Sequence, residues 1–137
     1  MEKHWKLTDE AFVYQFEHCI LNPSIFSHEA HLRLAWIYLH KCSKQEAEER
    51  IQIGLQKFVS AIGAKDKYNA TITLAAMKAV DHFRLKLDTN NFHDFIITFP
   101  KLKSNFKALM RAHYSFDIYN SMKAKTTFLQ PDLIPFN

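Results

Sequence analysis

Glycine is nearly absent from this chain of 137 residues, and its scarcity constrains the fold more than any other feature. Only Gly54 and Gly63 occur. A β-sandwich or barrel needs glycine in many tight turns, because those turns use backbone angles that other residues avoid. Hydrophobic residues make up 47% of the chain and include 12 Phe, so apolar surface for a packed core is ample. We therefore predict an all-α fold.

Side chains that cap helix N-termini divide the chain into helical segments. Thr8, Ser27, Ser43 and Asn69 each precede a stretch in which apolar residues recur at helical spacing. Gly63 follows the third stretch and supplies the left-handed position that ends many helices. We predict a single domain over residues 1–137, a compact helical bundle of five to seven helices. The predicted helical segments are about 8–20, 28–41, 43–62, 69–87, 92–99, 103–113 and 117–123.

The C-terminal stretch has the composition of a packed segment without regular structure. Pro131 and Pro135 interrupt any helix, while Phe128, Leu129 and Leu133 are too apolar for a free tail. We expect this stretch to pack as an extended strap across the helices.

Several properties favour a cytoplasmic protein. The N-terminus is polar, and the longest apolar runs, such as Leu34–Leu39, are much shorter than a bilayer span. Neither export nor membrane insertion is predicted. The two cysteines, Cys19 and Cys42, lack zinc-type spacing, so we expect both to be reduced core residues. The sequence leaves the oligomeric state open.

The net charge of +4 is unevenly distributed. Residues 101–125 contain six basic residues and one acid, Asp117. Such a stretch could bind nucleic acid or an acidic partner. However, Phe and Leu alternate with these bases as an amphipathic helix requires, which favours a solvated helix face over a nucleic-acid site.

The first candidate site lies at the start of the second predicted helix. His28 and His31 are three residues apart, so both imidazoles lie on one helix face and could hold a divalent metal ion. A helix N-terminus disfavours cationic imidazole, and a metal ligand must be neutral. Glu17 is a candidate third ligand and Arg33 a candidate anion-binding residue. The alternative is that these histidines only cap the helix.

Two further candidate sites carry phenol, amide, hydroxyl and imidazole groups. Tyr68, Asn69 and Thr71 lie at a helix start, where free backbone amides bind anions or polar ligands. Plain capping by Asn69 is the competing interpretation. His113 and Tyr114 follow another helix and could exchange protons with a ligand. A histidine there is also stabilised by the helix dipole without any chemistry.

The chain resembles a family of uncharacterised small bacterial proteins over almost its whole length. The matching stretches are F-S-H-E-A-H-L-R-L-A-W at Phe26–Trp36, K-Y-N-A-T-I-T at Lys67–Thr73, His113–Ser115 and Gln130–Leu133. The resemblance implies an all-helical fold and brings no established activity. In many relatives the middle motif is similar to K-Y-H-E-T-I-T, which would add a His and a Glu to a metal site. This sequence has Asn69 and Ala70 there instead, so two ligands that the resemblance implies are missing.

The leading functional hypothesis is a domain that binds a small molecule or a divalent metal ion. Three polar motifs fall at helix ends, where a bundle can gather them in one cleft. If the chain is an enzyme, metal-assisted hydrolysis or oxidation fits, with Tyr68 or His113 handling protons. No glycine-rich phosphate loop, nucleophile elbow or kinase signature occurs. The alternatives are a protein-interaction module with structural His and Tyr caps and, more weakly, nucleic-acid binding.

Overall fold

The computed structural model describes residues 1–136 as an all-helical protein. These residues form eight α-helices and three short 3-10 helices and contain no strand, which confirms the predicted fold class. None of these helices is both long and apolar enough to span a bilayer. The chain divides into two compact units, and the boundary between them lies between Tyr68 and Asn69. The prediction of one domain stays a prediction.

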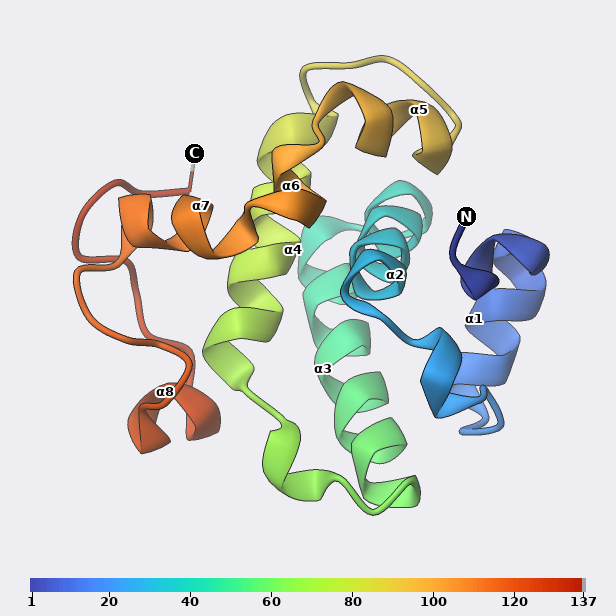
Figure 1. Cartoon of the computed structure of the whole chain (residues 1–137), viewed down its shortest axis with the longest axis horizontal. Coiled ribbons are helices and arrows are strands. Elements are labelled where there is room, and N and C mark those ends of the chain that lie inside the picture. Colours follow the sequence, from blue (N-terminus) through green and yellow to red (C-terminus); the bar gives the residue numbers. More distant parts are fainter. Residues whose placement is uncertain (137) are drawn as a thin grey trace. The chain divides into compact units, whose positions relative to one another are not determined.

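Unit 1 comprises the first 68 residues. Its helices are η1 (Lys3–Lys6), α1 (Asp9–Glu17), η2 (Pro23–Ile25), α2 (His28–Lys41), α3 (Lys44–Ala61) and η3 (Lys65–Lys67). Helix α3 contacts both α1 and α2 (Figure 1). Three predicted caps are confirmed, because Thr8, Ser27 and Ser43 each accept a hydrogen bond from the backbone N–H three residues later.

The first helix ends three residues earlier than predicted. Cys19 adopts a left-handed backbone with φ of +58°. The Cys19 N–H donates to the Phe16 carbonyl, and the Ile20 N–H donates to the Gln15 carbonyl. This pattern is a Schellman motif with Cys19 at the position that glycine normally occupies. Gly63, with φ of +73°, ends α3 in the predicted way.

The core of unit 1 is aromatic. Phe12, Phe16 and Phe58 are buried, and the ring of Phe26 stacks on that of Phe16 with centroids 5.3 Å apart. A Cβ atom at Gly54 would lie 2.7 Å from the Phe16 ring. Gly54 therefore serves close packing of α3 against α1.

Unit 2 begins at Asn69. Its helices are α4 (Ala70–Arg84), α5 (Phe92–Thr98), α6 (Lys101–Ser104), α7 (Phe106–His113) and α8 (Met122–Thr126). The predicted helix 103–113 is divided at Asn105, whose φ of −142° is not helical. The predicted helix 117–123 is wrong in its bounds, because α8 starts at Met122 and is capped by Ser121.

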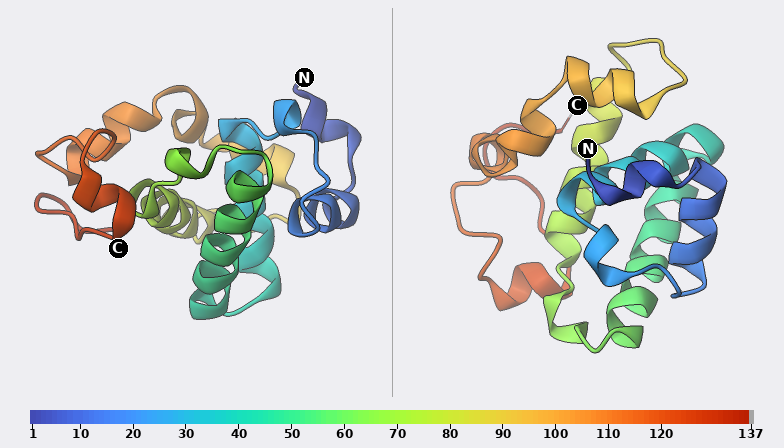
Figure 2. Two further views of the ribbon diagram at one scale, coloured as in Figure 1. Left: turned by 90° about the horizontal axis from the view of Figure 1, so that it is seen from below. Right: turned by 45° about the vertical axis from the view of Figure 1, so that its right-hand side comes forward.

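The residues that follow α8 form the expected strap. They are hydrogen-bonded to both α4 and the end of α7: the Leu129 N–H donates to Thr71, and the Leu133 N–H donates to the His113 carbonyl. Figures 1 and 2 show this segment in red, running back from α8 beside α4 toward α7. The strap thereby joins the start of α4 to the end of α7.

Candidate functional site

The predicted site residues belong to both units. Unit 1 contains Glu17, His28, His31, Arg33 and Tyr68, and unit 2 contains Asn69, Thr71, His113 and Tyr114. Because these residues are divided between the two units, the prediction of one common cleft stays a prediction.

His28 and His31 differ in their surroundings. His28 is exposed, whereas the Nε2 atom of His31 is buried and has no hydrogen-bond partner among the described residues. Burial, with a smaller contribution from the charge of His28, lowers the pKa of His31 to about 4. The His31 ring is therefore neutral at pH 7, as a metal ligand must be.

Glu17 is held by a separate polar group. Its Oε2 accepts hydrogen bonds from the Tyr38 hydroxyl at 2.7 Å and from Arg50 Nη2 at 2.6 Å. Burial opposes ionisation, but these two bonds outweigh it and lower the pKa of Glu17. The predicted metal site of His28, His31 and Glu17 stays a prediction, and a metal at Glu17 would compete with Tyr38 and Arg50.

Arg33 binds the N-terminal segment, and its role as an anion-binding residue stays a prediction. The side chain is only 4% exposed. It donates to the backbone carbonyls of His4 at 2.7 Å and Leu7 at 2.8 Å, and to Asp9 Oδ1 at 2.9 Å. A buried guanidinium with this set of acceptors stabilises the packing of η1 and the start of α1 on α2.

A cluster that the sequence analysis missed lies beside Arg33. His4 and Glu29 are buried, and His4 Nε2 is 2.6 Å from Glu29 Oε1, which also accepts from Trp5 Nε1 at 2.8 Å. Glu2 Oε1 lies 3.9 Å from His4 Nε2 and accepts a hydrogen bond from Ser27. One ligand atom from each of Glu2, His4 and Glu29 lies within 4.8 Å of the others, a spacing that suits a cation.

The hydrogen bonds of this cluster nevertheless favour a structural role. Arg33 Nη1 is 3.3 Å from His4 Nδ1, and a guanidinium only donates, so Nδ1 keeps its lone pair. Nε2 therefore carries the hydrogen and donates it to Glu29. Burial and the charge of Arg33 outweigh the effect of Glu29 and lower the pKa of His4. A cation at Nε2 would have to displace both this hydrogen and the bond from Arg33.

In unit 2, the side chains of Asn69 and Thr71 bind backbone groups that lie much later in the chain. Asn69 Oδ1 accepts from the Ile72 N–H, so the predicted capping role is confirmed, and its Nδ2 donates to the Ile118 carbonyl at 2.9 Å. Thr71 Oγ1 donates to the Thr127 carbonyl and accepts from the Leu129 N–H. These bonds hold the backbone at Ile118 and the strap against the start of α4.

His113 and Tyr114 also bind the strap. His113 Nδ1 lies 2.6 Å from the Ile134 carbonyl, and its ring stacks on Phe136 with centroids 4.1 Å apart. The Tyr114 hydroxyl donates to the Leu129 carbonyl at 2.7 Å. Burial, followed by the charge of Asp132, raises the pKa of Tyr114 to about 12.

Tyr68 is the last residue of unit 1. Burial raises the pKa of its hydroxyl.

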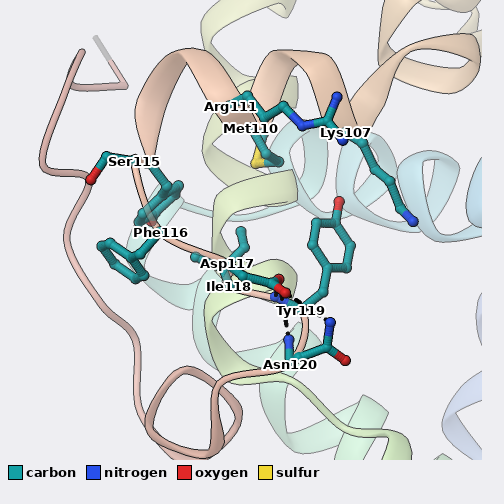
Figure 3. A pocket seen from close by; sticks show the side chains of 10 residues that line it. Lys107, Met110, Arg111, Ser115, Phe116, Asp117, Ile118, Tyr119 and Asn120 are labelled. Carbon is teal, nitrogen blue, oxygen red and sulfur yellow. Dashed lines mark hydrogen bonds between the residues drawn. The ribbon is translucent and has the colours of Figure 1, made fainter.

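A pocket of about 460 Å³ lies next to Tyr114 (Figure 3). One wall is α7, which contributes Lys107, Met110 and Arg111, and the other is the connection 114–120. Both walls belong to unit 2. The predicted residue Tyr114 lines this pocket, whereas His113 lines a smaller apolar cavity of about 140 Å³ beside Phe136.

The connection is shaped by a turn centred on Asp117. Asp117 Oδ1 accepts from the backbone N–H groups of Tyr119 and Asn120, and Oδ2 accepts from Asn120 Nδ2 at 2.8 Å. The bond from Asn120, followed by that from the Tyr119 amide, lowers the pKa of Asp117. This turn directs the Tyr119 side chain toward α7.

Tyr119 lines the pocket from the connection 114–120. Its hydroxyl is buried and has no hydrogen-bond partner among the described residues. Lys107 Nζ lies 5.1 Å from the centre of its ring. Burial raises the pKa of Tyr119, and the nearby charge of Arg111 opposes this rise. Figure 3 shows its hydroxyl directed toward the side chains of Lys107 and Arg111.

Comparison with known proteins adds no relative: no family model, curated protein or solved structure matches this chain. The family resemblance described above therefore stays a prediction.

Proposed function

We propose that this protein binds a small organic molecule in the pocket of unit 2. The observation that carries the proposal is the buried Tyr119 hydroxyl at the pocket wall, which has no hydrogen-bond partner in the part of the chain that the structure describes. A buried hydroxyl without a hydrogen bond costs free energy, and a bound ligand would recover it. The pocket volume of about 460 Å³ lies within the range of small-molecule sites.

The mixed lining of the pocket supports binding of an amphipathic molecule. Met110, Ile118 and Phe116 offer apolar surface, while Lys107 and Arg111 offer charged donors. Of the groups suited to proton transfer, Asp117 in the lining is bound by Asn120, and His113 lies outside the lining and is bound by the Ile134 carbonyl. The proposal is thus a binding function rather than a reaction.

The methionine methyl groups provide a direct test. Met110 lines the pocket, whereas Met77 is buried in α4 and Met122 is exposed. With ¹³C-methyl methionine in the full chain, small aromatic molecules that bind should shift the Met110 signal and leave those of Met77 and Met122 in place. If the molecules tested shift only the Met122 signal, or shift no methionine signal, the proposal is contradicted.

A further inference from the structure

We propose that the pocket recognises a phosphate monoester, whose phosphoryl oxygens contact Lys107, Arg111 and Tyr119. This inference rests on the proposed binding function and names its ligand class. The three donors come from two separate parts of unit 2, since Lys107 and Arg111 lie on α7 and Tyr119 lies on the connection that follows it.

The two cations on α7 outnumber the one acid of the pocket lining, Asp117, whose pKa the charge of Lys107 helps to lower. Lys107 and Arg111 are four residues apart on one helix, where like charges repel. Among the described residues neither forms an ion pair. The acid in the same lining, Asp117, already accepts hydrogen bonds from Asn120 and from two backbone amides. With two positive side chains and one negative, the wall carries net positive charge.

The Tyr119 hydroxyl adds a neutral donor between these cations. Its pKa is raised, so the hydroxyl keeps its hydrogen at pH 7 and can donate it. Figure 3 shows that the phenol reaches from the connection toward both cationic side chains. An anionic oxygen placed there would accept from the hydroxyl and offset the repulsion between Lys107 and Arg111.

A phosphate monoester fits this arrangement better than a carboxylate. Its three terminal oxygens match three donor groups, and its charge of nearly −2 at pH 7 suits two cations. A carboxylate offers two oxygens and one charge. The apolar lining from Met110, Phe116 and Ile118 would contact the organic part of the ester.

The test compares four probes on the full chain: phenyl phosphate, phenylacetate, benzyl alcohol and inorganic phosphate. Dissociation constants are measured by titration calorimetry at constant ionic strength, and the Met110 methyl signal locates each probe. Phenyl phosphate should bind about tenfold more tightly than phenylacetate, and still more tightly than benzyl alcohol, because charged hydrogen bonds are added. Inorganic phosphate should bind more weakly than its phenyl ester, because it lacks the apolar part.

Variants assign the donors. Tyr119→Phe keeps the ring and removes the hydroxyl, and Lys107→Gln and Arg111→Gln each remove one charge. Each should weaken phenyl phosphate about tenfold while benzyl alcohol binding changes less than about twofold. Lys101→Gln is the matched control, because Lys101 is an exposed lysine of α6 outside the pocket lining. Unfolding curves confirm that every variant is folded.

The outcomes separate the two proposals. If benzyl alcohol and phenylacetate shift Met110 and bind as tightly as phenyl phosphate, the pocket binds small molecules but the phosphate assignment is wrong. If Lys101→Gln weakens phenyl phosphate as much as Lys107→Gln, attraction to a general basic surface replaces the assigned site. If none of the probes shifts Met110, both proposals fail.

Discussion

His4 donates its Nε2 hydrogen to Glu29 across 2.6 Å, joining η1 to the first turn of α2 through two buried side chains. The bond links residues that are 25 positions apart. Arg33 completes the connection by binding the His4 carbonyl. This network determines how the N-terminal segment packs within unit 1 (Figure 2).

Glu29→Ala should lower the free energy of unfolding by about 3 kcal/mol, because the His4 and Trp5 ring hydrogens would lose their buried acceptor. Glu29→Gln retains an acceptor oxygen and should cost less. Urea unfolding measures both, with Glu10→Ala as the control at an exposed position. Equal losses at Glu10 and Glu29 would show that the network contributes little.

Stability should decrease as the pH falls from about 6.5 to about 4. The pKa of His31 is about 4 in the folded chain and about 6.5 when unfolded. Between these values the unfolded chain binds more protons, so protonation favours unfolding. His31 alone would account for at most about 3 kcal/mol, and His4, whose pKa is also lowered, adds to the decrease.

Urea unfolding at pH 7, 5.5 and 4.5 measures this dependence. His31→Leu removes one titrating group and should flatten the pH dependence relative to the unsubstituted chain. His82→Leu, at a half-buried histidine of α4, serves as the control. A pH dependence that His31→Leu leaves unchanged would contradict the assigned burial of this ring.

Cys19→Gly should raise the free energy of unfolding by about 1 kcal/mol, because Cys19 has the left-handed backbone that glycine adopts without steric cost. Gly63→Ala is the matched opposite change at the end of α3 and should lower it by a similar amount. Chemical unfolding of both variants checks the sign. A destabilising Cys19→Gly would mean that packing of the cysteine outweighs its backbone strain.

Thr71→Val should destabilise the attachment of the strap by about 1–2 kcal/mol, because the Leu129 N–H loses its acceptor and the Thr127 carbonyl loses its donor. Hydrogen exchange of the Leu129 amide should accelerate together with this loss. Thr98→Val is the control, since Thr98 is exposed and donates only within α5. Unchanged exchange at Leu129 would show that Thr71 does not hold the strap.

Local signals predicted much of the helical pattern. The caps at Ser27, Ser43 and Asn69 act within three residues, so the sequence displays them directly. The sequence does not show where α1 ends, because the left-handed residue there is Cys19 rather than glycine. It does not show the break at Asn105 either, since no proline or glycine marks that position.

The candidate site was only partly predictable for a similar reason. The sequence indicates Tyr114 as a site residue, and it presents Lys107 and Arg111 only as charges of a basic stretch. The role of Tyr119 depends on a turn formed by Asp117 and on the return of the chain toward α7, which no short motif encodes. The pairing of His4 with Glu29 likewise arises only when distant segments pack.

The Tyr119 hydroxyl is the centre of the functional account, and ¹³Cζ-tyrosine NMR observes it directly among the five tyrosines. Saturating phenyl phosphate should shift the Tyr119 signal, identified by its loss in Tyr119→Phe, and leave those of Tyr38 and Tyr68 in place. A Tyr119 signal that does not move at saturation would contradict binding at this hydroxyl.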